Sequence, residues 1–374
     1  MKIGVPKEIK NNEYRVGMIP AAVRELTARG HTVFVETKAG DAIDLSDEIY
    51  VRAGATILPS AEEIFARADL IVKVKEPQPG EIRQLRPGQT LFTYLHLAPD
   101  PAQTKALLEA GIIGIAYETV TDARGGLPLL APMSEVAGRM SIQAGAHALE
   151  MESGGRGQLL GGVPGVPAAK VVVLGGGVVG TNAARMAMGV EAHVTVLDVS
   201  LPRLYELDLQ FGAMLNTIYS TIDTIEEHVL AADLVIGAVL LPGAAAPKLI
   251  TEAMVKGMKK GSVLVDVAID QGGCSQTSRP TTHTNPTYRL HDVVHYCVAN
   301  MPGAVARTST FALNNATLPF VIALAEQGPE KAMAQNPHLR AGLNVYKSAL
   351  TYKAVAEAQK LPYSRAEEVL GLSY

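Results

Sequence analysis

Three ionisable side chains follow short apolar segments in the first third of the chain. His96 lies near the end of LFTYLHLAPD (residues 91–100), Lys75 ends LIVKVK, and Arg15 lies in NNEYRVGMIP. A histidine can exchange a proton near neutral pH, an arginine can bind a carboxylate through two hydrogen bonds, and a lysine adds a point charge. Individually, such residues more often cap a surface or pack in a core. Together they predict a cationic site with one acid–base group.

A second set of polar residues occurs in the segments SVLVDVAIDQGG and VVHYCVANM. Asp270 is expected just past a strand end, where Gly272 and the next glycine let the backbone approach a ligand closely. Asp266 lies deeper in the same strand, which favours a structural role. Asn300 could hold an amide and Met301 could flank an apolar ring, or both could serve packing; the sequence does not decide between these alternatives.

A glycine-rich turn follows the apolar segment KVVVL. Gly175, Gly177 and Gly180 have the spacing G-x-G-x-x-G, and a segment typical of a helix follows at once. In this context the glycines allow a tight turn, close approach of a pyrophosphate and packing of the helix on the strand, and the helix N-terminus supplies N–H donors. Asp198 ends the next strand, 18 residues after Gly180, which suits a carboxylate that binds ribose hydroxyls. Its charge would repel a 2′-phosphate, so NAD is favoured over NADP, although Arg203 lies nearby.

The elements that must position these residues alternate between strands and helices. Short apolar runs such as KIGVP, HTVFVE and IIGIAYE alternate with segments of helical spacing such as PAAVRELTARG, and the same alternation returns after residue 170. Strands that are apolar on both faces and alternate with helices predict mostly parallel sheets covered on both sides. A helix is expected over residues 134–151, linking two domains, and helices are expected from about residue 302 to residue 360.

The composition indicates a globular protein that acts on small molecules. The chain has 374 residues, 48% hydrophobic residues, 19% charged residues and a formal net charge of −4. This length suits two domains, and the charge gives no basic surface for nucleic acid or membranes. The two cysteines, Cys274 and Cys297, are too few for a disulfide framework, and the N-terminus lacks the apolar region of a signal peptide. We therefore expect a cytoplasmic protein whose partners are small molecules or copies of itself.

Several motifs, in order and spanning most of the chain, resemble the alanine dehydrogenase family. They are PKEIKNNEYRVGMIP, IVKVKEP, FTYLHLAPD, LGGGVVGTNAARMA, VDVAIDQGG and VANMPGAVARTSTFALNNATLP. The resemblance implies the reversible conversion of L-alanine, NAD and water to pyruvate, ammonium and NADH. It also implies that Arg15 and Lys75 bind the substrate carboxylate and that His96 and Asp270 form the catalytic pair.

The resemblance further implies a set of contacts to NAD. Besides the glycine turn, they would fall on Ser134, Val178, Val179, Asp198, Arg203, Ser220, Val239, Leu240, Val267, Ala268, Ile269, Asp270, Arg279, Val298, Ala299, Asn300 and Met301.

The expected fold class is α/β, with two Rossmann-like domains and an active-site cleft between them. By resemblance, the substrate domain is discontinuous (residues 1–130 and 305–374), the NAD domain spans residues 131–304, and the assembly is a homohexamer. Some relatives carry a carboxylate and a histidine four residues apart where this chain has Ala323 and Gln327, so no metal is expected.

The main alternative is the NAD(H)-binding component of a proton-translocating transhydrogenase, which resembles the same family and has no amino-acid substrate. An NAD-binding redox sensor is a third possibility. Neither has a reason to keep Arg15, Lys75 and His96 together. An oxidoreductase acting on a related substrate, such as a saccharopine-type imine, also fits the motifs, because the sequence does not display the volume of the pocket.

Overall fold

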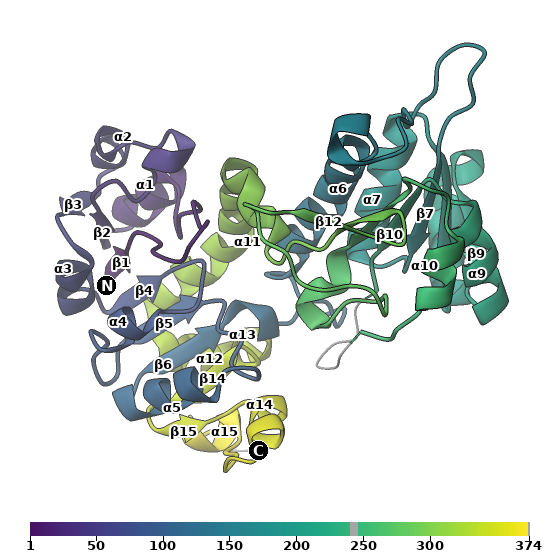
Figure 1. The fold of residues 1–374 in the computed structure, drawn as a ribbon. Helices are drawn as coiled ribbons and strands as arrows, with labels where there is room; N and C mark the ends of the chain where they lie inside the picture. Colours follow the sequence, from purple (N-terminus) through teal and green to yellow (C-terminus); the bar gives the residue numbers. More distant parts are fainter. Residues whose placement is uncertain (240–245, 373–374) are drawn as a thin grey trace. The chain divides into compact units, whose positions relative to one another are not determined.

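The computed structural model describes residues 1–239 and 246–372. The chain divides into two compact units (Figure 1). Unit 1 contains Met1–Met133 and Val305–Tyr374, and unit 2 contains Ser134–Ala304. No helix within the described ranges is long and apolar enough to span a lipid bilayer.

Unit 1 is built on a sheet with the strand order β15-β14-β6-β5-β4-β1-β2-β3. Strands β1 to β6 are mutually parallel. Beyond β6 the sheet continues with β14, which pairs antiparallel with β6, and β15, which pairs antiparallel with β14. The strands are β1 (Lys2–Val5), β2 (Thr32–Glu36), β3 (Thr56–Leu58), β4 (Leu70–Val72), β5 (Thr90–Thr93), β6 (Ile113–Ala116), β14 (Leu343–Tyr346) and β15 (Ala349–Leu350).

Several helices of unit 1 begin where the sequence supplies a cap or a proline. Ser60 and Asp100 each accept a hydrogen bond from the backbone N–H three residues later, and prolines occupy the first turn of several helices, where a missing N–H costs nothing. The helices are α1 (Pro20–Ala28), α2 (Asp47–Arg52), α3 (Ala61–Arg67), α4 (Pro79–Ile82), α5 (Pro101–Ala110), α11 (Ala306–Gln327), α12 (Pro329–Gln335), α13 (Pro337–Arg340), α14 (Lys353–Gln359) and α15 (Ala366–Val369).

Unit 2 is built on a sheet with the order β12-β13-β11-β10-β7-β8-β9, in which only β12 pairs antiparallel. Its strands are β7 (Lys170–Leu174), β8 (His193–Asp198), β9 (Asn216–Tyr219), β10 (Leu234–Gly237), β11 (Val263–Asp266), β12 (Thr287–Leu290) and β13 (Val293–Tyr296). Its helices are α7 (Val178–Gly189), α8 (Leu201–Phe211), α9 (Ile222–Ala231) and α10 (Glu252–Gly257), together with most of α6 (Ala131–Ala148), in which the division between the units falls.

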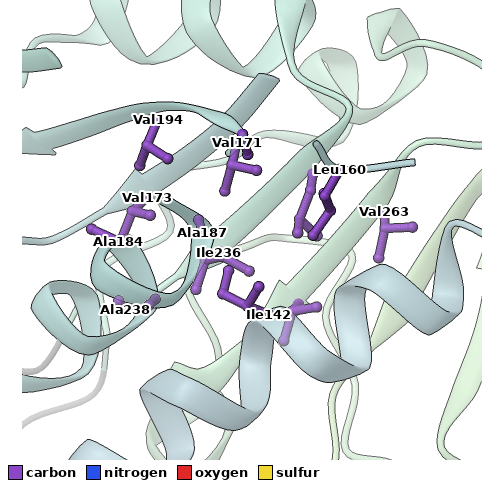
Figure 2. Packing of buried hydrophobic residues seen from close by; sticks show 14 of the residues in the cluster. Ile142, Leu160, Val171, Val173, Ala184, Ala187, Val194, Ile236, Ala238 and Val263 are labelled. Carbon is purple, nitrogen blue, oxygen red and sulfur yellow. The ribbon is translucent and has the colours of Figure 1, made fainter. Parts of the chain in front are cut away.

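Both faces of the unit 2 sheet are covered by apolar side chains. On one face Val171 and Val173 pack with Ile142 of α6 and Ala184 of α7 (Figure 2). On the other face Val172 and its neighbours pack against α9 and α10. Successive strand residues point to opposite faces, so this double cover explains the continuous apolar runs in the sequence. The predicted fold class, two mostly parallel sheets with helices, is confirmed.

The expectation of helix throughout the C-terminal region is wrong for residues 343–350. This segment forms the β14–β15 hairpin, in which Tyr346 pairs with Ala349 and β14 pairs with β6. Lys347, at the turn, has a φ of 56°, which suits a two-residue hairpin turn rather than a helix. Leu343, Asn344 and Val345 are all buried, as expected for a strand that is covered on both faces.

Candidate active site

Arg15, Lys75 and His96 follow the carboxyl ends of three adjacent strands in unit 1. In the sheet β4 lies between β1 and β5. Lys75 comes three residues after β4 ends and His96 three residues after β5 ends, slightly beyond the strand ends that the sequence predicted, while Arg15 lies in the loop between β1 and α1. Because these strands are parallel, their carboxyl ends meet at one edge, where ligands bind in sheets of this kind.

Arg15 is buried and is held by a carboxylate two residues before it in the chain. Its Nε donates to Glu13 Oε1 at 2.7 Å and its Nη2 to Glu13 Oε2 at 2.6 Å, and its Nη1 lies 3.1 Å from the sulfur of Met133. Burial alone would raise the pKa of Glu13, but the hydrogen bonds and charge of Arg15 outweigh it and lower that pKa. The two-point contact therefore fixes the plane of a charged guanidinium.

Lys75 differs from the lysine two residues before it. Lys73 is fully buried and its ammonium binds Glu8 at 3.1 Å and Glu81 at 2.7 Å. The Lys75 ammonium, in contrast, donates no hydrogen bond and forms no ion pair to any residue that the structure describes. Burial, and then the charge of Arg15, lower the pKa of Lys75. An ammonium without a partner beside a second cation is suited to binding an anion.

His96 has a half-exposed ring on an unusual backbone. Its φ of 47° lies in the left-handed region, which a side chain other than glycine adopts at a cost. Glu118 stabilises this turn, because its carboxylate accepts the N–H of His96 at 2.6 Å and that of Leu95 at 3.2 Å. The imidazole lies parallel to the ring of Tyr94, with 5.7 Å between the centroids, and its Nδ1 is 3.9 Å from Glu118 Oε1.

In unit 2 the glycine turn has the geometry that a dinucleotide requires. Gly175 has a φ of 97°, and a Cβ on Gly180 would lie 1.8 Å from the carbonyl oxygen of Gly175, so glycine is required at both positions. A Cβ on Gly177, in contrast, would meet nothing within 4 Å. Gly177 immediately precedes α7, whose first N–H groups are suited to binding phosphate.

Asp198 lies beside this turn at the end of β8. Its Oδ2 accepts the N–H of Gly176 at 2.6 Å and its Oδ1 that of Ser200 at 2.8 Å. Arg203 does not pair with Asp198: its Nε donates to the Gly176 carbonyl at 2.7 Å, its Nη2 to Thr181 Oγ1 at 2.7 Å, and its Nη1 binds Glu206. The carboxylate is thus fixed where ribose hydroxyls are expected, and the residues present fit NAD.

Asp270 lies farther from its strand than the sequence predicted. It is exposed and lies in the 3₁₀ segment Val267–Gln271, four residues after β11 ends. Asp266 has the structural role expected for it, since it is fully buried and its Oδ2 accepts hydrogen bonds from Cys274 N at 2.9 Å and Ser278 Oγ at 2.5 Å. These contacts fix the loop that follows Asp270.

The other residues expected at the NAD site mostly follow the carboxyl ends of parallel strands in unit 2. Val178 and Val179 follow β7, Ser220 follows β9, Val239 follows β10, Val267, Ala268 and Ile269 follow β11, and Val298, Ala299, Asn300 and Met301 follow β13. Ser134 lies on α6, and Leu240 lies outside the described residues. Arg279 places its guanidinium over the ring of Tyr288, 4.3 Å from the centroid.

Three of these residues differ from a ligand-binding residue with an exposed side chain on an ordinary backbone. The side chains of Val298 and Met301 are almost fully buried, which leaves mainly their backbone for a ligand, and Asn300 has a φ of 65°.

Three carboxylates that the sequence patterns did not indicate, Glu8, Glu13 and Glu118, fix Lys75, Arg15 and His96 respectively. Glu13 could have been found from its spacing, because a glutamate two residues before a candidate anion-binding arginine can reach its guanidinium. Glu8 and Glu118 are far in sequence from the residues that they hold, so no local signal identifies them.

The chain is similar to known proteins over its whole length. Residues 4–137 match the model of the alanine dehydrogenase/PNT N-terminal domain, and residues 141–353 match that of the C-terminal domain. An alanine dehydrogenase of Halomonas elongata is 61% identical over 99% of this chain and all of that protein. One of Mycobacterium tuberculosis is 52% identical with the same coverage of both chains.

Solved structures agree with these relatives. An L-alanine dehydrogenase has a TM-score of 0.94 and 53% identity, covering 96% of this chain and 99% of that one. A transhydrogenase from Sinorhizobium meliloti has a TM-score of 0.82 and 25% identity, covering 94% of this chain and all of that one. Both solved structures share the fold of this chain, and the L-alanine dehydrogenase has the higher sequence identity and the higher TM-score of the two. The chain therefore belongs to the alanine dehydrogenase/PNT family.

Proposed function

We propose that this protein is an NAD-dependent oxidoreductase that converts L-alanine and water reversibly to pyruvate and ammonium. The observation that carries the proposal is the Lys75 ammonium, which has no partner among the described residues and lies close enough to Arg15 for that charge to lower its pKa. Two cations at the edge where His96 also lies are suited to a small anionic substrate. The names of the relatives that are 52–61% identical support the same function.

Arg15 and Lys75 bind the substrate carboxylate in this proposal. Glu13 already fixes the guanidinium of Arg15, so this group needs little reorganisation to bind a carboxylate. Lys75 adds a positive charge that no described carboxylate neutralises by an ion pair. The carboxylate is common to alanine and pyruvate, so both cations serve both directions of the reaction.

His96 moves the proton. NAD would supply the hydride acceptor when bound, and loss of the α-hydride from alanine with a neutral amine would leave the protonated imine (iminium) of pyruvate. Water adds to the iminium carbon while His96 takes a proton from that water, which gives a carbinolamine. His96 then returns this proton to the carbinolamine nitrogen, and the C–N bond breaks as the hydroxyl group becomes the carbonyl and releases its proton to the departing ammonia, which leaves as ammonium. By the family resemblance, Asp270 is the second member of the catalytic pair. Tyr94, parallel to the imidazole, and Glu118, bonded to the backbone of His96, limit the positions that the ring can take.

An absorbance assay for NADH across a panel of amino acids tests the proposal. We expect L-alanine to reduce NAD faster than any other amino acid of the panel. Arg15→Ala should abolish most of this activity and leave the dissociation constant of NADH, measured by fluorescence titration, close to that of the wild type. If the protein instead passes hydride between NADH and an oxidised nucleotide analogue with no response to any amino acid, it is a transhydrogenase component.

A cytoplasmic location and a homohexamer belong to the same proposal. The family resemblance implies the hexamer. Cys274 and Cys297 are free and buried, which suits a reducing compartment. Light scattering during size-exclusion chromatography measures the mass of the assembly, and a mass other than six times 39.5 kDa would contradict the hexamer.

A further inference from the structure

One buried carboxylate binds three consecutive residues at the end of β4. Glu8 Oε1 accepts the N–H of Val74 at 2.7 Å and that of Lys75 at 3.3 Å, and Glu8 Oε2 accepts a hydrogen bond from the Lys73 ammonium at 3.1 Å. We call this arrangement the Glu8 clasp. Only 7% of Glu8 and none of Lys73 is exposed, so water does not compete effectively for these contacts.

The clasp replaces strand pairing where that pairing stops. β1 and β4 pair only as far as Gly4 and Ile71. On the other side, β5 still binds the same segment, since Lys73 N donates to the Phe92 carbonyl and Thr93 Oγ1 to the Lys75 carbonyl. The chain bends at residues 74 and 75, and the carboxylate accepts both N–H groups there. Without it, a buried donor would lose its partner, which costs free energy.

The far end of the clasp is anchored to a helix. Lys73 also binds Glu81 Oε1 at 2.7 Å, and Glu81 Oε2 accepts the N–H of Gln78 just before α4. Burial alone would lower the pKa of Lys73, but the charges of Glu8 and Glu81 outweigh it and raise that pKa. Lys73 therefore stays charged and is held on two sides. Of the two lysines in this segment, only Lys75 is left available to a substrate.

We propose that Glu8 is a positioning residue for Lys75: by binding the backbone of residues 74–75 and the ammonium of Lys73, it holds the Lys75 side chain at the substrate carboxylate. Glu8 lies in the same β1–α1 loop as Arg15, so the clasp also connects the two chain segments that carry the two cations. This inference rests on the proposed function, in which Lys75 binds that carboxylate.

A matched pair of double variants tests the clasp. Glu8→Gln/Lys73→Met and Glu8→Ala/Lys73→Met each remove one carboxylate and one ammonium, so both keep the formal charge of the wild-type cluster. Glutamine fills the space of the glutamate and retains an oxygen that can accept the N–H groups of residues 74 and 75, whereas alanine provides neither the volume nor the acceptor. We expect the KM for pyruvate to rise about tenfold or more in the alanine variant and to stay within about threefold of the wild-type value in the glutamine variant.

The NADH dissociation constant should be unchanged in both, since both substitutions lie in unit 1 and the glycine turn belongs to unit 2. Equal KM values for the two folded variants would overturn the proposal. Should neither double variant fold, Glu8→Asp decides: this carboxylate is shorter by one methylene group and should raise the KM about threefold or more, and an unchanged KM would overturn the proposal.

The Lys75→Ala background shows whether Glu8 acts through Lys75. If it does, the alanine and glutamine variants should have the same KM for pyruvate once Lys75 is removed, because coupled residues have non-additive effects. A persisting tenfold difference would mean that Glu8 acts elsewhere. Absence of turnover in the wild type would refute the proposed function instead, so the two failures are distinguishable.

Discussion

Two glycines of the same turn should respond to alanine in opposite ways. A Cβ on Gly180 would lie 1.8 Å from the Gly175 carbonyl oxygen and 3.2 Å from Val173 Cγ1. Ordinary contacts need roughly 3.5 Å, so α7 and the turn must separate by more than an ångström. Overpacking of this kind costs about 2–3 kcal/mol of unfolding free energy. For a unit of this size, the melting temperature should fall by roughly 4–12 °C.

Gly177 is the matched control, because it lies in the same turn with open space in front of it. Its φ is −67°, which alanine adopts without strain, and a Cβ there would meet nothing within 4 Å. Gly177→Ala should therefore change the unfolding free energy by less than about 1 kcal/mol. The added methyl group would occupy the space that we assign to the pyrophosphate, so the affinity for NADH should fall at least tenfold, or about 1.4 kcal/mol.

Differential scanning fluorimetry without ligand and fluorescence titration with NADH separate the two effects. The expected result is a variant that is destabilised (Gly180→Ala) and one that is stable but binds NADH weakly (Gly177→Ala). If Gly177→Ala binds NADH as tightly as the wild type, the pyrophosphate does not lie on this turn. If Gly180→Ala melts at the wild-type temperature, the close approach to Gly175 does not constrain the fold.

Three further results are expected. Asp198→Gly should narrow the preference for NAD over NADP, measured as the ratio of kcat/KM values, because it removes both a ribose contact and a repulsive charge; an unchanged ratio would assign the selectivity elsewhere. The pKa of Lys75 is lowered below the usual value of 10.5, and only the protonated ammonium attracts a carboxylate. The affinity of the enzyme–NADH complex for pyruvate should therefore be constant at low pH and weaken as the pH rises through that pKa. This pH dependence should disappear in Lys75→Ala. His96→Ala should lower kcat by a factor of about 10²–10⁴ with little change in melting temperature, because the side chain is 46% exposed. His96→Asn, which keeps polarity and approximate size, should lower kcat by a similar factor. A wild-type kcat in either variant would mean that His96 serves only packing.

The sheets were predictable from the sequence because a strand that is buried on both faces has a continuous run of apolar residues. Val171 to Leu174 are all buried since the two faces of β7 are both covered, and such runs are recognisable without a structure. The hairpin at residues 343–350 was not predicted because its sequence carries no such pattern. Its strands are short, and their pairing partner β6 lies more than 200 residues earlier in the chain, so pairing rather than local preference decides the outcome.

The site was predictable in its residue types but not in its supports. The apolar segment before Lys75 pointed to a strand end, yet the pattern Lys-Val-Lys does not say which lysine is buried. Glu8 settles that question, and it is 65 residues away from Lys73. The left-handed backbone of His96 depends in the same way on Glu118, 22 residues later. Carboxylates that are distant in the sequence, Glu8 and Glu118, therefore determine which candidate side chains are available to bind a substrate.

The order of the elements along the chain has a consequence during synthesis on the ribosome. β6 emerges early, but its antiparallel partner β14 is made only after the whole of unit 2. At roughly 5–20 residues per second, the interval is on the order of 10–50 s. Throughout it, nascent unit 1 lacks the strand that closes this edge of its sheet, and an open edge can pair with another chain. Unit 2 is contiguous and can mature first, so the nascent protein carries a finished nucleotide-binding unit beside an unfinished sheet that chaperones are suited to shield.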